Sequence, residues 1–520
     1  MSNTLIVSVI VIYFLVLVFI AWLTSRKADN NSFFLGDKKS PWYIVAFGMI
    51  GASLSGVTFI SVPGGVDGGQ FSYMQMVFGY FIGYIIVSYV LMPIYYKMNL
   101  TSIYEYLKHR FGFWSYKTGA AFFLLSRIIG ASIRLLLVAS VLQQILFDDW
   151  GVPFWATVVI SVLLIWIYTN KGGIKTIIWT DTLQTAFMLF AVFFTVWLVS
   201  DALHLSDNGG LVNSIADSKY SQIFFFDDWH SGNYFWKHFL GGMFITIGMT
   251  GLDQDMMQKN LSCKNIKDAQ KNMMSMAVVL VVVNLVFLAM GALLFMYNAS
   301  TGIGNDVIQA GRTDLLFSSI AMEGSLGTAV GLLFLLGLIA AAYSSADSAL
   351  TSLTTSFSVD FLNVKEKEKS QVSVSSDELL DSVSQDGTGQ EKVRKLVHIA
   401  MSAVLVLVVV LLRYTTEDSA IWLLIKLAGF TYGPLIGLFF FGIITKRSLK
   451  DKFVLYVCVL VPLLMGVLWW YSTGGPGVEK DVLGWTGKYK FGAELIIYNA
   501  LLSFGALFLI SKRKPKIQQQ

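Results

Sequence analysis

Long apolar runs separated by short polar stretches dominate the pattern of this sequence. Each run holds roughly 20 mostly apolar residues, the length that a helix needs to cross the hydrocarbon core of a bilayer. The runs cover residues 4–24, 43–66, 72–96, 118–147, 153–169, 176–201, 235–257, 272–297, 326–358, 397–415, 418–445, 453–472 and 492–511. The pattern predicts an all-α polytopic membrane protein with about 13 transmembrane helices. No basic residue precedes the first run and no small-residue cleavage site follows it, so we interpret it as a retained helix rather than a signal peptide.

Composition and charge agree with a membrane protein and predict its orientation. Of the 520 residues, 55% are hydrophobic and only 14% are charged, which excludes an ordinary soluble domain. Lys and Arg cluster in alternate loops, which predicts an extracellular N-terminus and a cytoplasmic C-terminus in the cell inner (plasma) membrane. Residues 364–395 are rich in Ser, Glu and Lys, and we expect a disordered cytoplasmic linker there. Cys263 and Cys458 fall in a loop and a helix, so no disulfide is expected.

A polar stripe interrupts the apolar run over residues 326–358. Its members are small or carry hydroxyls and recur at helical spacing: Ala341, Ser344, Ser345, Ser348, Thr351, Ser352 and Thr355. Asp347 lies beside this stripe. Hydroxyls with a carboxylate at membrane depth suit a small hard cation, because each oxygen replaces one water of hydration. The alternative is that these hydroxyls only bond to their own backbone or pack against a neighbouring helix.

Glycine marks two other apolar runs. The second run contains Gly48, Gly51, Gly56 and Pro63, and the seventh contains Gly241, Gly242, Gly248 and Gly251. Interruptions at corresponding positions of two halves indicate discontinuous helices around a central site. The alternative for each run is close packing of helices through small residues. As a pair, the two runs favour the core of a transporter.

Four ordered motifs resemble those of a known family. They are GGIKTIIWTDTLQ (172–184), LDQDMMQK (252–259), AAAYSSADS (340–348) and GPLIGLFFFGI (433–443). Together they resemble the conserved segments of the solute:sodium symporter family, to which the sodium/glucose cotransporters belong. Two further stretches, ASLSGVTFISVPG (52–64) and LTSIYEYLKHRF (100–111), are most similar to the bacterial sialic acid transporters of that family.

The resemblance implies a fold and a way of working. The fold is a LeuT-type core of two inverted five-helix repeats that works by alternating access with sodium symport. The implied divisions are 1–42 (an extra N-terminal helix and a cytoplasmic loop), 43–201 (first repeat), 202–234 (extracellular loop), 235–445 (second repeat, containing the linker 364–395) and 446–520 (two C-terminal helices and a basic tail). The expected partners are a small-molecule solute, sodium ions and the lipid bilayer. We expect a monomer and no nucleic-acid partner.

Two sodium sites are implied by the resemblance. The family's common Na⁺ site maps to the carbonyls of Gly51, Leu54 and Ala341 and to the hydroxyls of Ser344 and Ser345, three of which the polar stripe already contained. Some relatives hold a second sodium, and those positions map to Asp181, Ser344, Asp347 and Ser348. Asp347 stands where the family usually has a hydroxyl. Two carboxylates around one monovalent ion leave a net negative charge, which protonation, tighter cation binding or a basic residue such as Lys175 or Arg134 could relieve.

A third set of residues is implied for the solute. Ser55 and Thr58 in the first broken helix and Arg134 on the third core helix match positions that the sialic acid branch uses. Arg127 is a competitor for the last role, and pairing of Arg134 with an acidic residue such as Asp181 is the structural alternative. The branch's glutamine falls on Gly79, while Gln75 lies one turn earlier, which leaves the solute open.

The predicted function is therefore sodium-coupled import of a small polar organic solute, with a carboxylated sugar such as sialic acid as the first candidate. A neutral sugar, a polyol or an amino acid are alternatives, as are a sensor or a channel on the same fold. An enzyme is not expected, because the five histidines show no ligand spacing and no nucleophile–base set is visible.

Overall fold

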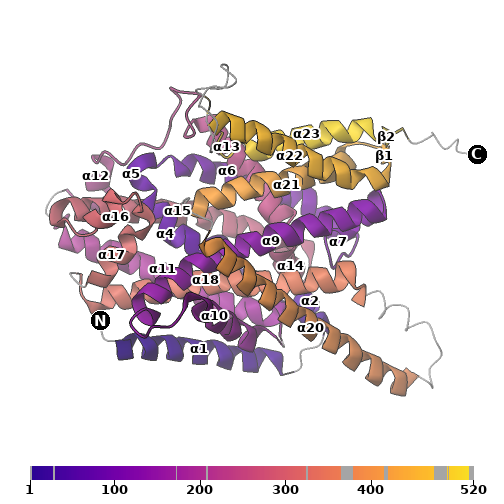
Figure 1. Ribbon diagram of the computed structural model, residues 1–520, viewed down its shortest axis with the longest axis horizontal. Coiled ribbons are helices and arrows are strands. Elements are labelled where there is room, and N and C mark those ends of the chain that lie inside the picture. Colours follow the sequence, from indigo (N-terminus) through magenta and orange to yellow (C-terminus); the bar gives the residue numbers. More distant parts are fainter. Residues whose placement is uncertain are drawn as a thin grey trace, which may run out of the picture.

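The computed structural model describes residues 3–26, 30–170, 172–206, 209–323, 326–364, 379–414, 420–473, 489 and 491–513. In this part the chain is almost entirely helical (Figure 1). The long helices are α1 (Asn3–Ser25), α6 (Tyr73–Ile86), α9 (Phe113–Leu142), α10 (Phe154–Thr169), α11 (Ile174–Ala202), α13 (Phe235–Thr246), α15 (Ile266–Thr301), α18 (Thr328–Ser356), α20 (Leu379–Arg413), α21 (Ala420–Ile444), α22 (Val454–Thr473) and α23 (Leu495–Leu509).

Shorter elements connect them. These are α2 (Asn30–Leu35), α3 (Trp42–Ser53), α4 (Gly56–Gly64), α5 (Val66–Gly69), α7 (Met92–Lys97), α8 (Glu105–Arg110), α12 (Leu211–Ala216), α14 (Gln254–Leu261), α16 (Asn305–Gln309) and α17 (Leu316–Glu323). Single π-helical turns follow α6, α9, α13 and α18 at Val87–Leu91, Gln143–Phe147, Ile247–Gly251 and Phe357–Phe361. Two short strands, β1 (Ser448–Leu449) and β2 (Ser511–Lys512), pair antiparallel and join the two ends of the C-terminal helix pair.

Length and composition identify the helices that could cross a membrane. Nine helices in the described part are long and apolar enough to cross a bilayer, and the bent pair α3–α4 makes a tenth. Helices α10 and α23 are apolar but shorter. The polytopic helical class is therefore confirmed, whereas the number thirteen stays a prediction. Part of the expected linker is helical, since α20 begins at Leu379; residues 365–378 lie outside the described part.

Both glycine-marked runs contain a break in the helix. The axes of α3 and α4 differ by 53°, and Ser55 between them has an extended backbone conformation. In the other run, α13 passes into a π-turn, and the chain then restarts as α14 after Asp253, whose carboxylate accepts hydrogen bonds from the amides of Asp255 and Met256. The predicted discontinuous helices are thus confirmed in both halves.

Helix α18 forms the centre of the bundle, with α11 packed along it (Figure 1). Of the candidate spans it is the most enclosed, with 78% of its apolar window buried. Helix α3 packs against both α11 and α18, so the first broken helix, α11 and α18 form the three walls that hold the polar residues of the site.

A glycine sets the distance between α3 and α11. The amide of Gly51 donates a hydrogen bond to the Thr185 hydroxyl at 3.1 Å, and a Cβ on Gly51 would lie only 2.1 Å from that oxygen. Since no atoms can approach so closely, the two helices can touch here only because residue 51 has no side chain.

We expect Gly51→Ala to push α3 from α11 and to destabilise the protein by about 1–3 kcal/mol, the usual range for overpacking. The measurement is the thermal unfolding midpoint in detergent, with Gly68→Ala as control, because a Cβ at Gly68 meets nothing within 4 Å. The double variant Gly51→Ala/Thr185→Ala should recover part of the loss. Equal unfolding midpoints for Gly51→Ala and Gly68→Ala would contradict this close approach of α3 and α11.

Candidate functional site

The break between α3 and α4 exposes backbone carbonyls beside α18. The Leu54 amide bonds to the Ile50 carbonyl and ends α3, and the carbonyls of the last helical turn then have no intrahelical partner. Gly51 lies in this last turn, and Leu54 is the residue that caps it. Just after the break, Gly56 faces Ala342 of α18, whose Cβ is 3.4 Å from the place of a Cβ on Gly56. The predicted carbonyl ligands therefore stand next to the helix that carries Ala341 and the two serines.

The two serines on α18 have different surroundings. Ser344 donates a hydrogen bond from its hydroxyl to Asp181 Oδ1 at 2.7 Å. Ser345 is fully buried, and its hydroxyl has no hydrogen-bond partner among the described residues. An unpaired buried hydroxyl costs roughly 1–3 kcal/mol of stability. A partner from outside the described residues would remove this cost. A cation that crosses this site would be such a partner.

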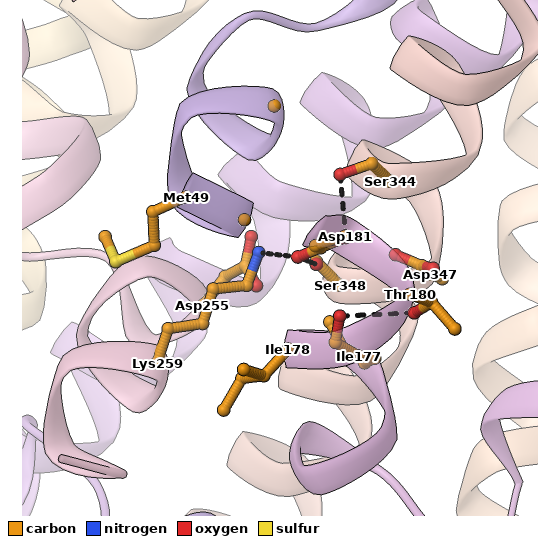
Figure 2. Close-up of polar contacts among 12 residues, drawn as sticks. Met49, Ile177, Ile178, Thr180, Asp181, Asp255, Lys259, Ser344, Asp347 and Ser348 are labelled. Carbon is orange, nitrogen blue, oxygen red and sulfur yellow. Dashed lines mark hydrogen bonds and ion pairs between the residues drawn. The ribbon is translucent and has the colours of Figure 1, made fainter. Parts of the chain in front are cut away.

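Asp181 of α11 is the centre of the polar contacts in Figure 2. Lys259 reaches it from α14, and its ammonium lies 2.7 Å from Asp181 Oδ2. Ser348 donates to the same oxygen at 3.4 Å. The side chains of Lys259 and Asp181 are each only 1% exposed, so this is an ion pair enclosed by protein.

Asp347 lies on the same side of α18 but has a different partner. The phenol of Tyr168, on α10, donates a hydrogen bond to Asp347 Oδ2 at 2.9 Å. Its other oxygen has no hydrogen-bond partner among the described residues, and the residue is fully buried. Neither Lys175 nor Arg134 is the counter-ion that the sequence suggested for these carboxylates: Lys175 pairs with Asp37 at 2.9 Å, and Lys259 takes the place beside Asp181.

A cavity of about 130 Å³ lies beside the broken helix. Ser55, Thr58 and Arg134, three of the residues predicted for the solute, line it. Arg127 also lines it, and most of the remaining wall is aromatic or aliphatic, with Tyr73, Tyr80, Tyr84, Met249 and Ile425 among its residues. This mixture of an apolar wall with a few polar groups is typical of a small-molecule site.

Two arginines reach this region, and only one of them is paired. Arg127 contacts the carboxylate of Asp255, and its other terminal nitrogen lies 3.9 Å from Asp253. Arg134 is almost fully buried and forms no ion pair with any residue in the described part of the chain. The structural alternative, in which Asp181 neutralises Arg134, does not hold, because Asp181 is bound to Lys259.

Gln75 and Gly79 do not line the cavity. The Gln75 amide donates to the carbonyls of Ser72 and Asn233 and accepts from the Phe225 amide, so it fastens the segment before α13 to α6. Gly79 lets α6 and α13 touch, since a Cβ there would lie 2.0 Å from the Phe239 carbonyl oxygen. In this structure Gln75 joins α6 to the segment before α13 and Gly79 joins α6 to α13, and their contact with the solute stays a prediction.

Comparison with known proteins identifies the family. The model of the Sodium:solute symporter family matches residues 33–451. The chain belongs to this family. It is a sodium-coupled symporter, a multi-pass membrane transporter and not an enzyme, and Na⁺ is its co-transported ion.

Relatives of known function and structure agree. The symporter is 26% identical over 462 residues to the sodium/sialic acid symporter NanT of Aliivibrio fischeri, covering 86% of this chain and 84% of that protein. It is 27% identical over 255 residues to the human sodium-coupled monocarboxylate transporter 2, covering 49% of this chain and 40% of that protein. A substrate-bound, outward-open structure of a Na⁺-coupled sialic acid symporter superposes with a TM-score of 0.73 at 22% identity, covering 98% of this chain and 99% of that one. The last likeness shows the fold, which is LeuT-type as predicted.

Two residues of this site were not anticipated from the sequence. Lys259 lies inside the motif LDQDMMQK, which indicates the family but no role for the lysine, and Tyr168 lies inside an apolar run. A signal for Lys259 existed, because a lysine among residues that become buried at membrane depth needs a counter-ion. The helix position of Tyr168 gave no such signal, since tyrosines are common in transmembrane segments.

We expect Ser345→Ala to weaken the apparent sodium affinity of the symporter about tenfold, because it removes one oxygen from a partly dehydrated cation at roughly 1–3 kcal/mol. The measurement is sodium-dependent uptake or sodium-dependent thermal stabilisation. Ser358→Ala is the matched control, since this serine is also buried with an unpaired hydroxyl but lies in the π-turn beyond α18. An unchanged sodium dependence of Ser345→Ala would remove the hydroxyl from the ion's path.

Proposed function

We propose that the solute of this symporter is a small polar organic anion, with a carboxylated sugar such as sialic acid as the first candidate. The observation that carries the proposal is the Arg134 guanidinium, which is buried at the cavity with no carboxylate within ion-pair distance in the described part. A buried charge is expensive unless it is paired, and a planar guanidinium binds a carboxylate through two parallel hydrogen bonds. The solute carboxylate would supply the missing partner.

The neighbouring residues suit the rest of such a solute. Ser55 and Thr58 face the same cavity from the broken helix and offer hydroxyls for hydrogen bonds to a sugar. The relatives also favour an anion, because the names of the two curated relatives given above specify sialic acid and monocarboxylates. A neutral sugar, a polyol or an amino acid remains the alternative, since hydroxyl donors serve those solutes equally well. A channel or a sensor on the same fold is the alternative from a different class.

The proposed transport cycle is alternating access. The cavity of 130 Å³ is smaller than the roughly 300–1,000 Å³ of sites that hold a drug-sized ligand. Binding of a sugar acid therefore requires the wall beside the broken helix to open. Sodium at the carbonyls of Gly51, Leu54 and Ala341 and the hydroxyls of Ser344 and Ser345 would favour one arrangement of α3, α4 and α18, and this links the ion to the solute.

We expect Arg134→Lys to lower uptake of an anionic sugar at least tenfold, because an ammonium cannot reproduce the planar fork of a guanidinium. Thermal stability should change little, since Arg134 pairs with no carboxylate in the described part. Arg127→Lys is the comparison: Arg127 holds Asp255, so its substitution should lower stability more than Arg134→Lys does. The measurements are radiolabelled uptake into proteoliposomes, with and without a sodium gradient, and unfolding midpoints. Equal losses of uptake in the two variants would make Arg134 structural and favour neutral solutes.

The orientation and organisation of the chain are also part of the proposal. An extracellular N-terminus, a cytoplasmic C-terminus and the inner (plasma) membrane agree with the alternation of basic loops. Repeats at 43–201 and 235–445 agree with the two helix breaks, since one break falls near the start of each repeat. A functional monomer is also part of the proposal.

Cysteine labelling tests the orientation directly. Cys263 and Cys458 are both buried, so the wild-type background should be low. We expect Val212→Cys, on exposed α12, to react with a membrane-impermeant thiol reagent in intact cells. Lys267→Cys, at the basic start of α15, should react only after permeabilisation. The reverse pattern would invert the proposed topology.

A further inference from the structure

The position beside Asp181 is already filled by a positive charge from the protein. Lys259 Nζ and Ser348 Oγ both bond to Asp181 Oδ2, and Ser344 Oγ bonds to Oδ1. Figure 2 shows the Lys259 side chain extending from α14 across to Asp181 on α11. Both carboxylate oxygens therefore have donors from the protein itself.

An ammonium and a sodium ion can each neutralise a buried carboxylate. Each carries one positive charge, and a buried carboxylate requires one such charge close by. The ammonium at 2.7 Å and the two serine hydroxyls leave Asp181 neutralised and hydrogen-bonded without any ion from solution. A sodium ion at this carboxylate would have to displace Lys259, which is 1% exposed and has no route to water without movement of α14.

The surroundings hold Lys259 in this place. The ammonium interacts electrostatically with Asp255 and Asp347 in addition to Asp181. Asp255 already contacts Arg127, and Asp347 accepts from Tyr168, so Asp181 is the carboxylate that needs Lys259. Every residue of α14 is buried, which fixes the helix that carries the lysine.

We propose that Lys259 is a tethered cation that takes the place of a second sodium ion at Asp181, so that transport is coupled only to sodium at the family's common site, here called the shared site (Gly51, Leu54, Ala341, Ser344 and Ser345). The inference rests on the proposed function for the shared site, and it replaces the expectation that Asp181, Asp347 and Ser348 hold a second sodium. A tethered charge returns with the protein and is not released, so it adds no ion to the coupling ratio. A second coupled sodium would raise the accumulation of solute by about 50-fold for each 100 mV of membrane potential.

Lys259→Met tests the proposal by removing the ammonium while keeping most of the side-chain volume. With Asp181 unpaired, sodium should enter beside Asp181, Ser344 and Ser348. We expect the purified variant to bind one more sodium ion per protein than the wild type in equilibrium binding of radioactive sodium. The sodium-to-solute ratio, measured from the parallel uptake of radioactive sodium and radiolabelled solute into proteoliposomes, should rise from one to two.

Two controls isolate the effect. Lys175→Met removes an ammonium from another Lys–Asp pair, Lys175 with Asp37. It should leave the number of bound sodium ions and the sodium-to-solute ratio unchanged. Lys259→Met/Asp181→Asn removes both charges and should return the ratio to one. Asp181→Asn alone should also leave the sodium count at the wild-type value, which covers the case in which Lys259→Met does not fold.

Two results would overturn the inference: a sodium count that falls in Asp181→Asn, or a folded Lys259→Met variant with the wild-type count. Sodium binding requires no solute, so these outcomes are separate from the proposed function. Failure to transport any sugar acid would refute the proposed solute. The number of sodium ions bound by Lys259→Met and by the wild type would still test the tethered cation.

Discussion

The cost of an unpaired charge in a low-dielectric interior governs how this symporter is built. Three buried basic residues, Arg127, Arg134 and Lys259, lie near the centre of the bundle, and each meets that cost differently. Arg127 contacts Asp255, and Lys259 is bound to Asp181. Arg134 stands at a cavity with no carboxylate within ion-pair distance in the described part, and the proposed solute anion would supply its partner. Two of the three cations are thus neutralised by carboxylates of the protein, and the proposed solute site rests on the third.

The sequence predicts the fold well because the bilayer leaves few choices. Apolar runs of membrane length must become helices, and the glycine-marked breaks appear at Ser55 and Asp253. The polar stripe on α18 was also visible, because hydroxyls at helical spacing lie on one face whatever the neighbours are. Boundaries were less certain: α20 starts at Leu379, inside a segment whose composition suggested disorder.

The contacts between helices could not be derived from the sequence in the same way. Spacing along the chain places Ser344 and Asp347 on one helix, but it does not say that Lys259 from α14 reaches Asp181 or that Tyr168 from α10 meets Asp347. Gln75 and Gly79 show the same limit, since a shift of about one helical turn or a rotation of α6 decides between cavity and packing surface. These side-chain contacts depend on how three or more helices pack together, and a single sequence does not determine that packing.

The hydrogen bonds of Gln75 have a mechanical consequence for the outer end of the molecule. Its amide joins α6 to the backbone at Phe225 and Asn233, on the segment that leads into α13. The Phe235 amide bonds in turn to the Phe225 carbonyl, so this segment is tied to the start of α13 as well. A strap fastened at both ends cannot swing independently like a hinged flap. Any movement at this end of the bundle must then carry α6, the strap and α13 together, as one stiff unit.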